Sequence, residues 1–422
     1  MFTTDQPAAD SCDAPLQKAE TFLDDTALSI PPEPATSPQS KSTALTRDPG
    51  LRVSRRKTKL IVALDPGSTP MDAIPALIRA GVDGFQIQLD PVDNQPALRM
   101  IYALRSSATA AQRQPAILLT SPDTGVEAHD RALAFASENG ADWLALGGLD
   151  EEAERTRIAG LIAERGRSRF GLMAWIEGDT AKDNLEALVA GLEGVIVGGA
   201  KSGSDCGGDT VPTLPQKVAH SCWLAGKSAW LTVTLDGQPD SAVDAPADDL
   251  ERVAAAIRGR AEAVILCGLT CPVKAMRALV EAVDRMAADR ERSLPTVEAL
   301  PGRLLTAVDE AVTLAVSRAG RVEAGGLLVF SRDERFAQSC ATLRPGGGPI
   351  VVFTPNVRMA RRLRLRYGLE PLVLDLDLPP KRRQAAARSR LLACGLAVPG
   401  ARLVVFQGEP GERSKVSEWT LD

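Results

Sequence analysis

From residue 59 onward, short apolar runs alternate with helix-length amphipathic stretches such as DAIPALIRAG and NLEALVAGL. Runs that are apolar on consecutive positions and partly β-branched are typical of strands buried on both faces of a parallel sheet. The eight expected strands lie at 59–64, 84–89, 116–119, 143–146, 170–176, 194–198, 229–234 and 263–268. Eight strand–helix units in succession predict an α/β protein with a TIM (β/α)8 barrel over about 59–292.

A second, smaller α/β set follows the Ser-Leu-Pro-Thr link at 293–296. Its expected strands, 326–330, 349–353, 371–376 and 402–406, alternate with expected helices at 302–318, 334–342, 357–367 and 380–395. A final alternating piece, KVSEWTL, could add an edge strand. The pattern predicts a separate, mostly parallel sheet with helices on both faces.

The first 56 residues differ from the rest because they are rich in Pro, Ser, Thr and Asp and lack a sustained apolar period. Such a composition predicts a disordered N-terminal extension. Within it, Leu16–Leu28 places apolar residues near helical spacing, which fits either a transient helix or a short partner-docking motif. The predicted organisation is therefore an extension (1–56), a barrel (57–294) and a C-terminal α/β domain (295–422).

Composition narrows the function classes. The net charge is −5, from 49 basic and 54 acidic residues, which does not indicate a general nucleic-acid binder. The basic stretches 358–368 and 380–392 fit a solvated helix face or subunit contacts better than nucleic acid, because aromatic residues do not interleave the arginines. No apolar run approaches the ~18 residues of a membrane span. Seven scattered cysteines and the absence of a signal-peptide pattern predict a soluble, cytoplasmic protein with reduced thiols.

Several segments resemble the pyruvate kinase family, in which a barrel also precedes a small α/β domain. They are RRKTKLIVALDPGST (55–69), ENGADWLALGG (138–148), AWIEGDTAKDNLEAL (174–188) and FTPNVRMARRLRLRYGLEPLVL (353–374). The resemblance covers about 55–422. It implies a glycolytic phosphotransferase that uses Mg²⁺ and K⁺ to make pyruvate and ATP from phosphoenolpyruvate and ADP, in a homo-oligomer.

The chain departs from this family after the third expected strand, where family members insert a β-rich lid domain. Only TSPDTGV (120–126) separates that strand from the next helix, so we expect no lid. Lid closure excludes water from a reaction site, and that contribution would be missing.

The chemistry expected at the strand ends also departs from the family. On the fifth strand the family has Lys-Ile-Glu, and this chain has Trp175, Ile176 and Glu177, so the metal-binding Glu survives and the phosphoryl-binding Lys does not. After the sixth strand, Lys201 aligns with the Mg²⁺-binding Asp and Gly199 with an Arg. We expect Lys201 to pair with Glu177 and fill the vacated metal site.

The remaining strand ends carry neutral side chains where the family carries charged or catalytic ones. Gln86 and Gln88 replace an Arg and an Asn, and Thr120 replaces a K⁺-binding Asp. On the seventh strand Val233 aligns with the catalytic Thr, although a slip of one residue would bring Thr232 or Thr234 there. The resemblance thus implies degenerate catalytic positions at Trp175, Val233 and Thr234, substrate positions at Gln86, Gln88, Gly199 and Thr232, and metal positions at Glu177, Lys201 and Thr120.

Family members bind a phosphorylated effector in a turn after the first strand of the C-terminal domain. By resemblance the effector loop here contains Ser331, Arg332 and Arg335. Asp333 and Glu334 in the same turn would repel phosphate, and the two arginines would offset them only in part.

These substitutions favour a catalytically inactive pyruvate-kinase-like protein with a regulatory or scaffolding role in central carbon metabolism. It would need no cofactor, and it would act as a homo-oligomer (dimer or tetramer), with a paralogue, or through a partner docked on residues 1–56. The alternative is an enzyme, either an active pyruvate kinase or a catalyst of another reaction on a small keto acid that uses Glu177 and Lys201.

Overall fold

The computed structural model describes residues 56–110, 113–149, 151–164, 170–177, 185–198, 214–235, 247–269, 273–292, 307–408 and 414–421. The chain divides into two units, residues 1–44 and 45–422, and every described residue belongs to the second. The predictions made for the N-terminal extension therefore lie outside the described residues, apart from Arg56.

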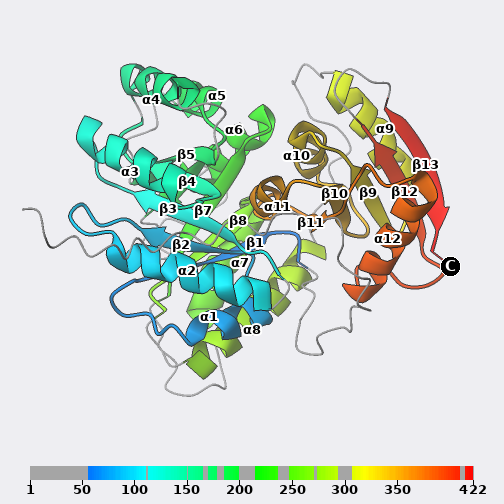
Figure 1. The fold of residues 1–422 in the computed structure, drawn as a ribbon, viewed down its shortest axis with the longest axis horizontal. Helices are drawn as coiled ribbons and strands as arrows, with labels where there is room; N and C mark the ends of the chain where they lie inside the picture. Colours follow the sequence, from blue (N-terminus) through cyan, green and yellow to red (C-terminus); the bar gives the residue numbers. More distant parts are fainter. Residues whose placement is uncertain are drawn as a thin grey trace, which may run out of the picture. The chain divides into compact units, whose positions relative to one another are not determined.

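Eight parallel strands form a closed barrel in chain order, and β1 pairs with β8 to complete it. The strands are β1 (Lys59–Leu64), β2 (Gly84–Gln88), β3 (Ala116–Ser121), β4 (Trp143–Leu146), β5 (Gly171–Glu177), β6 (Gly194–Gly198), β7 (Ser228–Thr234) and β8 (Ala263–Cys267). The helices that follow them are α1 (Ala73–Ala80), α2 (Gln95–Ala110), α3 (Val126–Glu138), α4 (Glu152–Glu164), α5 (Leu185–Gly191), α6 (Leu214–Ala225), α7 (Ala247–Arg258) and α8 (Val273–Arg292). The predicted TIM barrel is confirmed (Figure 1).

A five-stranded sheet follows, in the order β11-β10-β9-β12-β13. Its strands are β9 (Gly326–Phe330), β10 (Ile350–Thr354), β11 (Leu369–Val373), β12 (Arg402–Gln407) and β13 (Lys415–Thr420), of which only β13 runs antiparallel. The helices are α9 (Ala307–Arg321), α10 (Glu334–Leu343), α11 (Val357–Leu363) and α12 (Pro380–Ala393). Two separate apolar clusters lie on its faces, one with α9, α10 and α11 and one with α12. The predicted mostly parallel sheet and its KVSEWTL edge strand are confirmed.

The barrel interior is a packed core, as side chains of alternate strand positions fill it. Trp143 of β4 and Trp230 of β7 meet edge to face there, with ring centroids 5.0 Å apart. A Cβ on Gly171 would lie 2.4 Å from the Trp143 ring, so β5 needs glycine where the indole crosses it. Leu365 of the C-terminal domain belongs to the same interior cluster.

Arginines of the basic stretch 358–368 bind the barrel. Arg361 Nε lies 2.9 Å from Asp142 Oδ1, Arg362 Nη2 lies 2.6 Å from Glu193 Oε2, and Arg366 Nε lies 3.0 Å from Glu262 Oε2. These three carboxylates precede β4, β6 and β8, so the arginines join the C-terminal domain to the amino-terminal end of the barrel. The expected solvated face or subunit contact is therefore an intrachain contact for these arginines.

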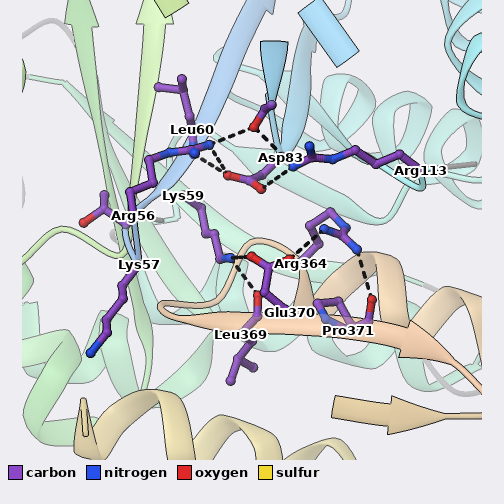
Figure 2. A network of polar contacts seen from close by, with 12 residues as sticks. Arg56, Lys57, Lys59, Leu60, Asp83, Arg113, Arg364, Leu369, Glu370 and Pro371 are labelled. Carbon is purple, nitrogen blue, oxygen red and sulfur yellow. Dashed lines mark hydrogen bonds and ion pairs between the residues drawn. The ribbon is translucent and has the colours of Figure 1, made fainter. Parts of the chain in front are cut away.

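The basic lead into β1 is anchored in the same region (Figure 2). Asp83 accepts hydrogen bonds from Arg56 (2.5 Å), Arg113 (3.3 Å) and the Leu60 backbone N–H (3.0 Å). Burial disfavours the Asp83 carboxylate, but the charges of Arg56, Lys59 and Arg113 outweigh it and lower its pKa to about 2. Lys59 Nζ in turn lies 2.9 Å from Glu370 Oε1 on β11.

Candidate functional site

The carboxyl ends of β1–β8 form the barrel mouth, the face on which sites of TIM barrels are built. Side chains along a strand alternate between faces, so the interior Trp230 of β7 places Thr232 and Thr234 on the interior side as well. Val233 belongs instead to the core between the strands and the outer helices. Of the three residues considered for the catalytic threonine, Val233 thus faces the outer helices, and its alignment with the catalytic position stays a prediction. A catalytic role for Thr232 or Thr234 stays a prediction.

Gln86 of β2 and Thr120 of β3 form one side of the mouth. Gln86 Nε2 donates to Thr120 Oγ1 at 3.1 Å, and both residues are buried. Gln86 Oε1 is buried without a hydrogen-bond partner in the described structure. Gln88, two positions further toward the strand end, is exposed. This side of the mouth therefore offers neutral amides and a hydroxyl, and one acceptor that lacks a donor.

Trp175 and Glu177 of β5 form another side of the barrel mouth. The Trp175 indole N–H donates to Glu177 Oε1 at 2.9 Å. The same indole lies against Gly198 at the end of β6, where a Cβ would come within 2.8 Å of the ring. The indole is therefore held over β6 by its neighbours. Gly199 and Lys201 lie outside the described residues, so their expected roles and the Lys201–Glu177 pair stay predictions.

The connection from β3 to α3 consists of residues 122–125. It lies directly on the β4–α4 loop, because a Cβ on Gly147 would be 2.2 Å from the Pro122 carbonyl oxygen. His129 of α3 supports this contact, with Nε2 at 2.9 Å from the Gly147 carbonyl and Nδ1 at 2.5 Å from Glu154 Oε1. His129 is not among the predicted site residues, although the sequence places it shortly after the third expected strand.

The described βα loops carry several acidic side chains. Among the described residues of these loops there is no Lys or Arg. The pKa of Asp65 is lowered by hydrogen bonds from the Ser68 hydroxyl and the Gly67 N–H, and that of Asp90 by the backbone N–H groups of Asp93 and Val92. The acidic residues of this face, Glu177 at the end of β5 included, are Asp65, Asp72, Asp90, Asp93, Asp123, Glu151 and Glu177. Arg155, in the first turn of α4, also reaches the β4–α4 loop and donates to the Leu149 carbonyl at 3.0 Å.

The described residues alone assemble no site for the Mg²⁺ and K⁺ expected by resemblance, and the aligned positions Gly199 and Lys201 lie outside them. No group of three or more His, Cys, Asp or Glu side chains in the described part of the chain is placed to hold a metal ion. The Thr120 hydroxyl accepts from Gln86, and Glu177 accepts the indole N–H. We therefore derive no step through either ion.

The expected effector loop is closed on itself. Asp333 caps α10 by accepting from the Arg335 N–H at 2.9 Å, and it also binds the Arg335 guanidinium at 2.8 Å. Ser331 Oγ donates to the Asp333 carbonyl, and Arg332 pairs with Asp377 at 2.6 Å. A carboxylate of the chain thus occupies the helix N-terminus, where an anion would otherwise bind.

The chain has the architecture of barrel proteins that carry a C-terminal α/β domain. Its (β/α)8 barrel is joined to a five-stranded α/β domain, and strand-end side chains gather at the barrel mouth. The family model "Pyruvate kinase, alpha/beta domain" matches residues 309–418. Pyruvate kinase 2 of Synechocystis sp. is 26% identical over 321 residues, covering 73% of this chain and 52% of the relative. A pyruvate kinase of Agrobacterium vitis is 27% identical over 301 residues, covering 70% and 61%.

Solved structures agree with these relatives. A crystal structure of a pyruvate kinase from Cryptosporidium parvum superimposes with a TM-score of 0.75 at 14% identity, over 90% of this chain and 98% of that one. The chain is thus similar to pyruvate kinases over most of its length, and its residues 309–418 match the model of that family's α/β domain. It spans about half to three fifths (52% to 61%) of the length of the curated relatives named above. Within the described residues, none of the helices combines the length and hydrophobicity that crossing a membrane requires.

Proposed function

We propose that this relative of the pyruvate kinases lacks pyruvate kinase activity and acts by binding, in a regulatory or scaffolding role in central carbon metabolism. The observation that carries the proposal is that two described strand residues, Gln86 and Trp175, have neutral side chains where the resemblance aligns a cationic Arg and Lys. Phosphoryl transfer places negative charge on the oxygens of the moving group, and cations must neutralise it. A single electrostatic group of this kind is worth roughly 3–4 kcal/mol of transition-state stabilisation.

Trp175 supports the same conclusion because it stands at the position of the phosphoryl-binding Lys. Its indole carries no net charge, and its N–H is directed to Glu177, the family's metal ligand. The four residues of the β3–α3 connection, 122–125, leave no room for a lid that would exclude water.

A coupled assay with lactate dehydrogenase, phosphoenolpyruvate, ADP, Mg²⁺ and K⁺ tests the proposal. We expect no turnover above that of the Glu177→Ala variant. Glu152→Ala, an exposed substitution on α4, is the matched control. Turnover that Glu177→Ala abolishes and Glu152→Ala preserves would overturn the proposal.

The second candidate is an active pyruvate kinase, or an enzyme acting on a small keto acid. Glu177 is retained at the end of β5, and Thr232 and Thr234 lie on the interior side of β7, which favours this reading. The coupled assay decides whether the protein is an active pyruvate kinase. Thermal stabilisation by pyruvate or 2-oxobutyrate that is lost in Thr232→Val would support an enzyme acting on a small keto acid.

We also propose a cytoplasmic location and a homo-oligomer (dimer or tetramer) or an assembly with a paralogue, as in the relatives' family. Residues 1–56 would add a docking segment. Light scattering of the purified chain tests the homo-oligomer. Capture of a paralogue with and without residues 1–56 tests the assembly with a paralogue and the docking segment. A monomer that captures no paralogue would contradict both.

A further inference from the structure

Arg362 of α11 joins the C-terminal domain to the barrel through one nitrogen atom. Its Nη2 lies 2.6 Å and 2.8 Å from the two carboxylate oxygens of Glu193, which comes directly before β6 of the barrel. The same nitrogen lies 3.2 Å from Oε1 of Glu334, the first residue of α10. Two carboxylates, one from each domain, therefore share a single guanidinium nitrogen.

Arg362 is also held in place from the barrel interior, by Trp143 of β4. The Arg362 backbone carbonyl accepts the Trp143 indole N–H at 3.3 Å, and the guanidinium carbon lies 5.7 Å from the centroid of the same ring. Trp143 is itself buried. Because this contact does not involve either carboxylate, a change in the charge of one carboxylate alters the pairing of the arginine and leaves its backbone in place.

The two carboxylates do not bind Arg362 equally. Glu193 accepts two hydrogen bonds from it, whereas Glu334 makes only the longer ion pair with it in the described structure. The two side chains are exposed to almost the same extent, 30% and 29%, so access to water does not distinguish them. Burial raises the pKa of Glu334, Arg362 offsets this increase only in part, and the charge of Glu193 adds to it. Glu334 is therefore the carboxylate that binds a proton first.

The other charged groups that act on Glu334 have partners of their own. Arg366, in the turn after α11, pairs with Glu262 at 3.0 Å. Asp333, the residue before α10, binds the guanidinium of Arg335 at 2.8 Å. The shared guanidinium is thus the described cation on which the charge of Glu334 depends most directly.

We propose that Arg362 is a proton-responsive link between the turn at 331–335 and the barrel. At neutral pH it divides between Glu193 and Glu334, and when Glu334 binds a proton it passes to Glu193 alone. Acidification then tightens the contact of α11 with the barrel and releases the start of α10 from that contact. The inference goes beyond the proposed function, because it is measured on stability and does not depend on whether the protein turns over a substrate.

Urea unfolding of the full chain between about pH 5 and pH 8 tests the proposal. Since the pKa of Glu334 is raised in the folded protein, the folded state binds the proton more tightly than the unfolded chain, in which Glu titrates near pH ~4.3. Stability due to this group is therefore greatest while it is protonated, and it falls as the pH rises through the raised pKa. Glu334→Gln should raise the unfolding midpoint at pH 8, and its advantage over the parent should shrink toward pH 5.

Glu310→Gln, the same substitution at an exposed position of α9, is the matched control. It should leave the midpoint and its pH dependence unchanged. A profile of Glu334→Gln that runs parallel to the parent's, or a lower midpoint of this variant at pH 8, would overturn the proposal. This comparison leaves Arg362 intact, so it does not depend on how a substitution of the arginine folds.

A double-mutant cycle of Arg362→Met and Glu193→Gln locates the effect at the contact between the domains. The coupling of these two residues should be about threefold or more stronger at pH 5 than at pH 8 in the parent, above the scatter of such cycles. In the Glu334→Gln background the coupling should be the same at both pH values. Equal coupling at pH 5 and pH 8 in the parent would overturn the proposal.

Discussion

Leu365 occupies the space that a side chain at Gly84 would need. A Cβ on Gly84 would lie 2.9 Å from Leu365 Cδ2 and 3.1 Å from the Ala116 carbonyl oxygen. Leu365 comes from the turn between α11 and β11 and is fully buried in the interior cluster of the barrel. The first residue of β2 is therefore a glycine because another domain inserts a side chain at the amino-terminal end of the barrel.

Gly84→Val should destabilise the protein by about 1–3 kcal/mol, since overpacking a filled core forces neighbours to move. Leu365→Ala alone should cost about 2–5 kcal/mol through the cavity it leaves. In the double variant the added valine fills part of that cavity. The double variant should therefore lose less stability than the sum of the losses of the two single variants. Chemical denaturation of the four proteins measures this coupling. Strict additivity would contradict the contact.

Asp83→Asn should cost about 3–5 kcal/mol, because it removes a buried carboxylate that Arg56 and Arg113 share, while Arg56 keeps its ion pair with Asp284. Asp72→Asn is the matched control. Asp72 is exposed and its side chain makes no capping hydrogen bond to α1, so its substitution should change stability by about 0.5 kcal/mol or less. Urea unfolding midpoints of the two variants provide the comparison, and equal midpoints would contradict the role of Asp83.

The same carboxylate predicts how stability depends on pH. The pKa of Asp83 is lowered to about 2 in the folded protein, against about 3.9 in an unfolded chain. Protons therefore bind the unfolded state first as the pH falls. The stabilisation is present above pH ~4 and is lost as the pH falls toward the lowered pKa of the folded state. Asp83→Asn should flatten this part of the stability profile measured between pH 5 and pH 2, and an unchanged slope would contradict it.

Periodicity predicted the fold because strands buried on both faces leave continuous apolar runs. The limits of β4 and β6 agree with the expected 143–146 and 194–198. The helix expected at 357–367 ends at Leu363, since the following turn carries Leu365 into the barrel and Arg366 to Glu262. That ending depends on another domain, and no local pattern encodes it.

The candidate site was only partly predictable. Resemblance placed Gln86, Thr120, Trp175 and Glu177 at strand ends, where they are found. Alignment put Val233 at the catalytic position, whereas the two-residue period of a strand turns it toward the helices. The Gln86–Thr120 and Trp175–Glu177 hydrogen bonds depend on how side chains meet in space, which the sequence pattern does not give.

The closed effector loop predicts no response to a sugar bisphosphate. Asp333 supplies the capping group of α10, so Asp333→Ala should cost about 1 kcal/mol. Asp377→Ala removes only the exposed pair with Arg332 and should cost less, because such pairs contribute about 0–1 kcal/mol. Thermal unfolding with and without fructose 1,6-bisphosphate measures both effects. Stabilisation of the parent protein by the sugar phosphate would contradict the closed loop.

The contact between Gly147 and the β3–α3 connection can be tested with substitutions of Gly147 and of Gly160 on α4. Gly147→Ala would bring a methyl group to 2.2 Å from the backbone oxygen of Pro122, which cannot move as a flexible side chain can. We expect a loss of more than about 2 kcal/mol, or separation of the β3–α3 and β4–α4 loops. Gly160→Ala is the matched control on α4, with nothing within 4 Å of the new Cβ. It should stabilise the protein by about 0.5–1 kcal/mol, because alanine is the better helix former.

Hydrogen exchange of the amides at 122–125 reports on the loop itself, and protection there should fall in Gly147→Ala alone. Equal protection in the two variants would mean that the short loop does not depend on its contact with Gly147.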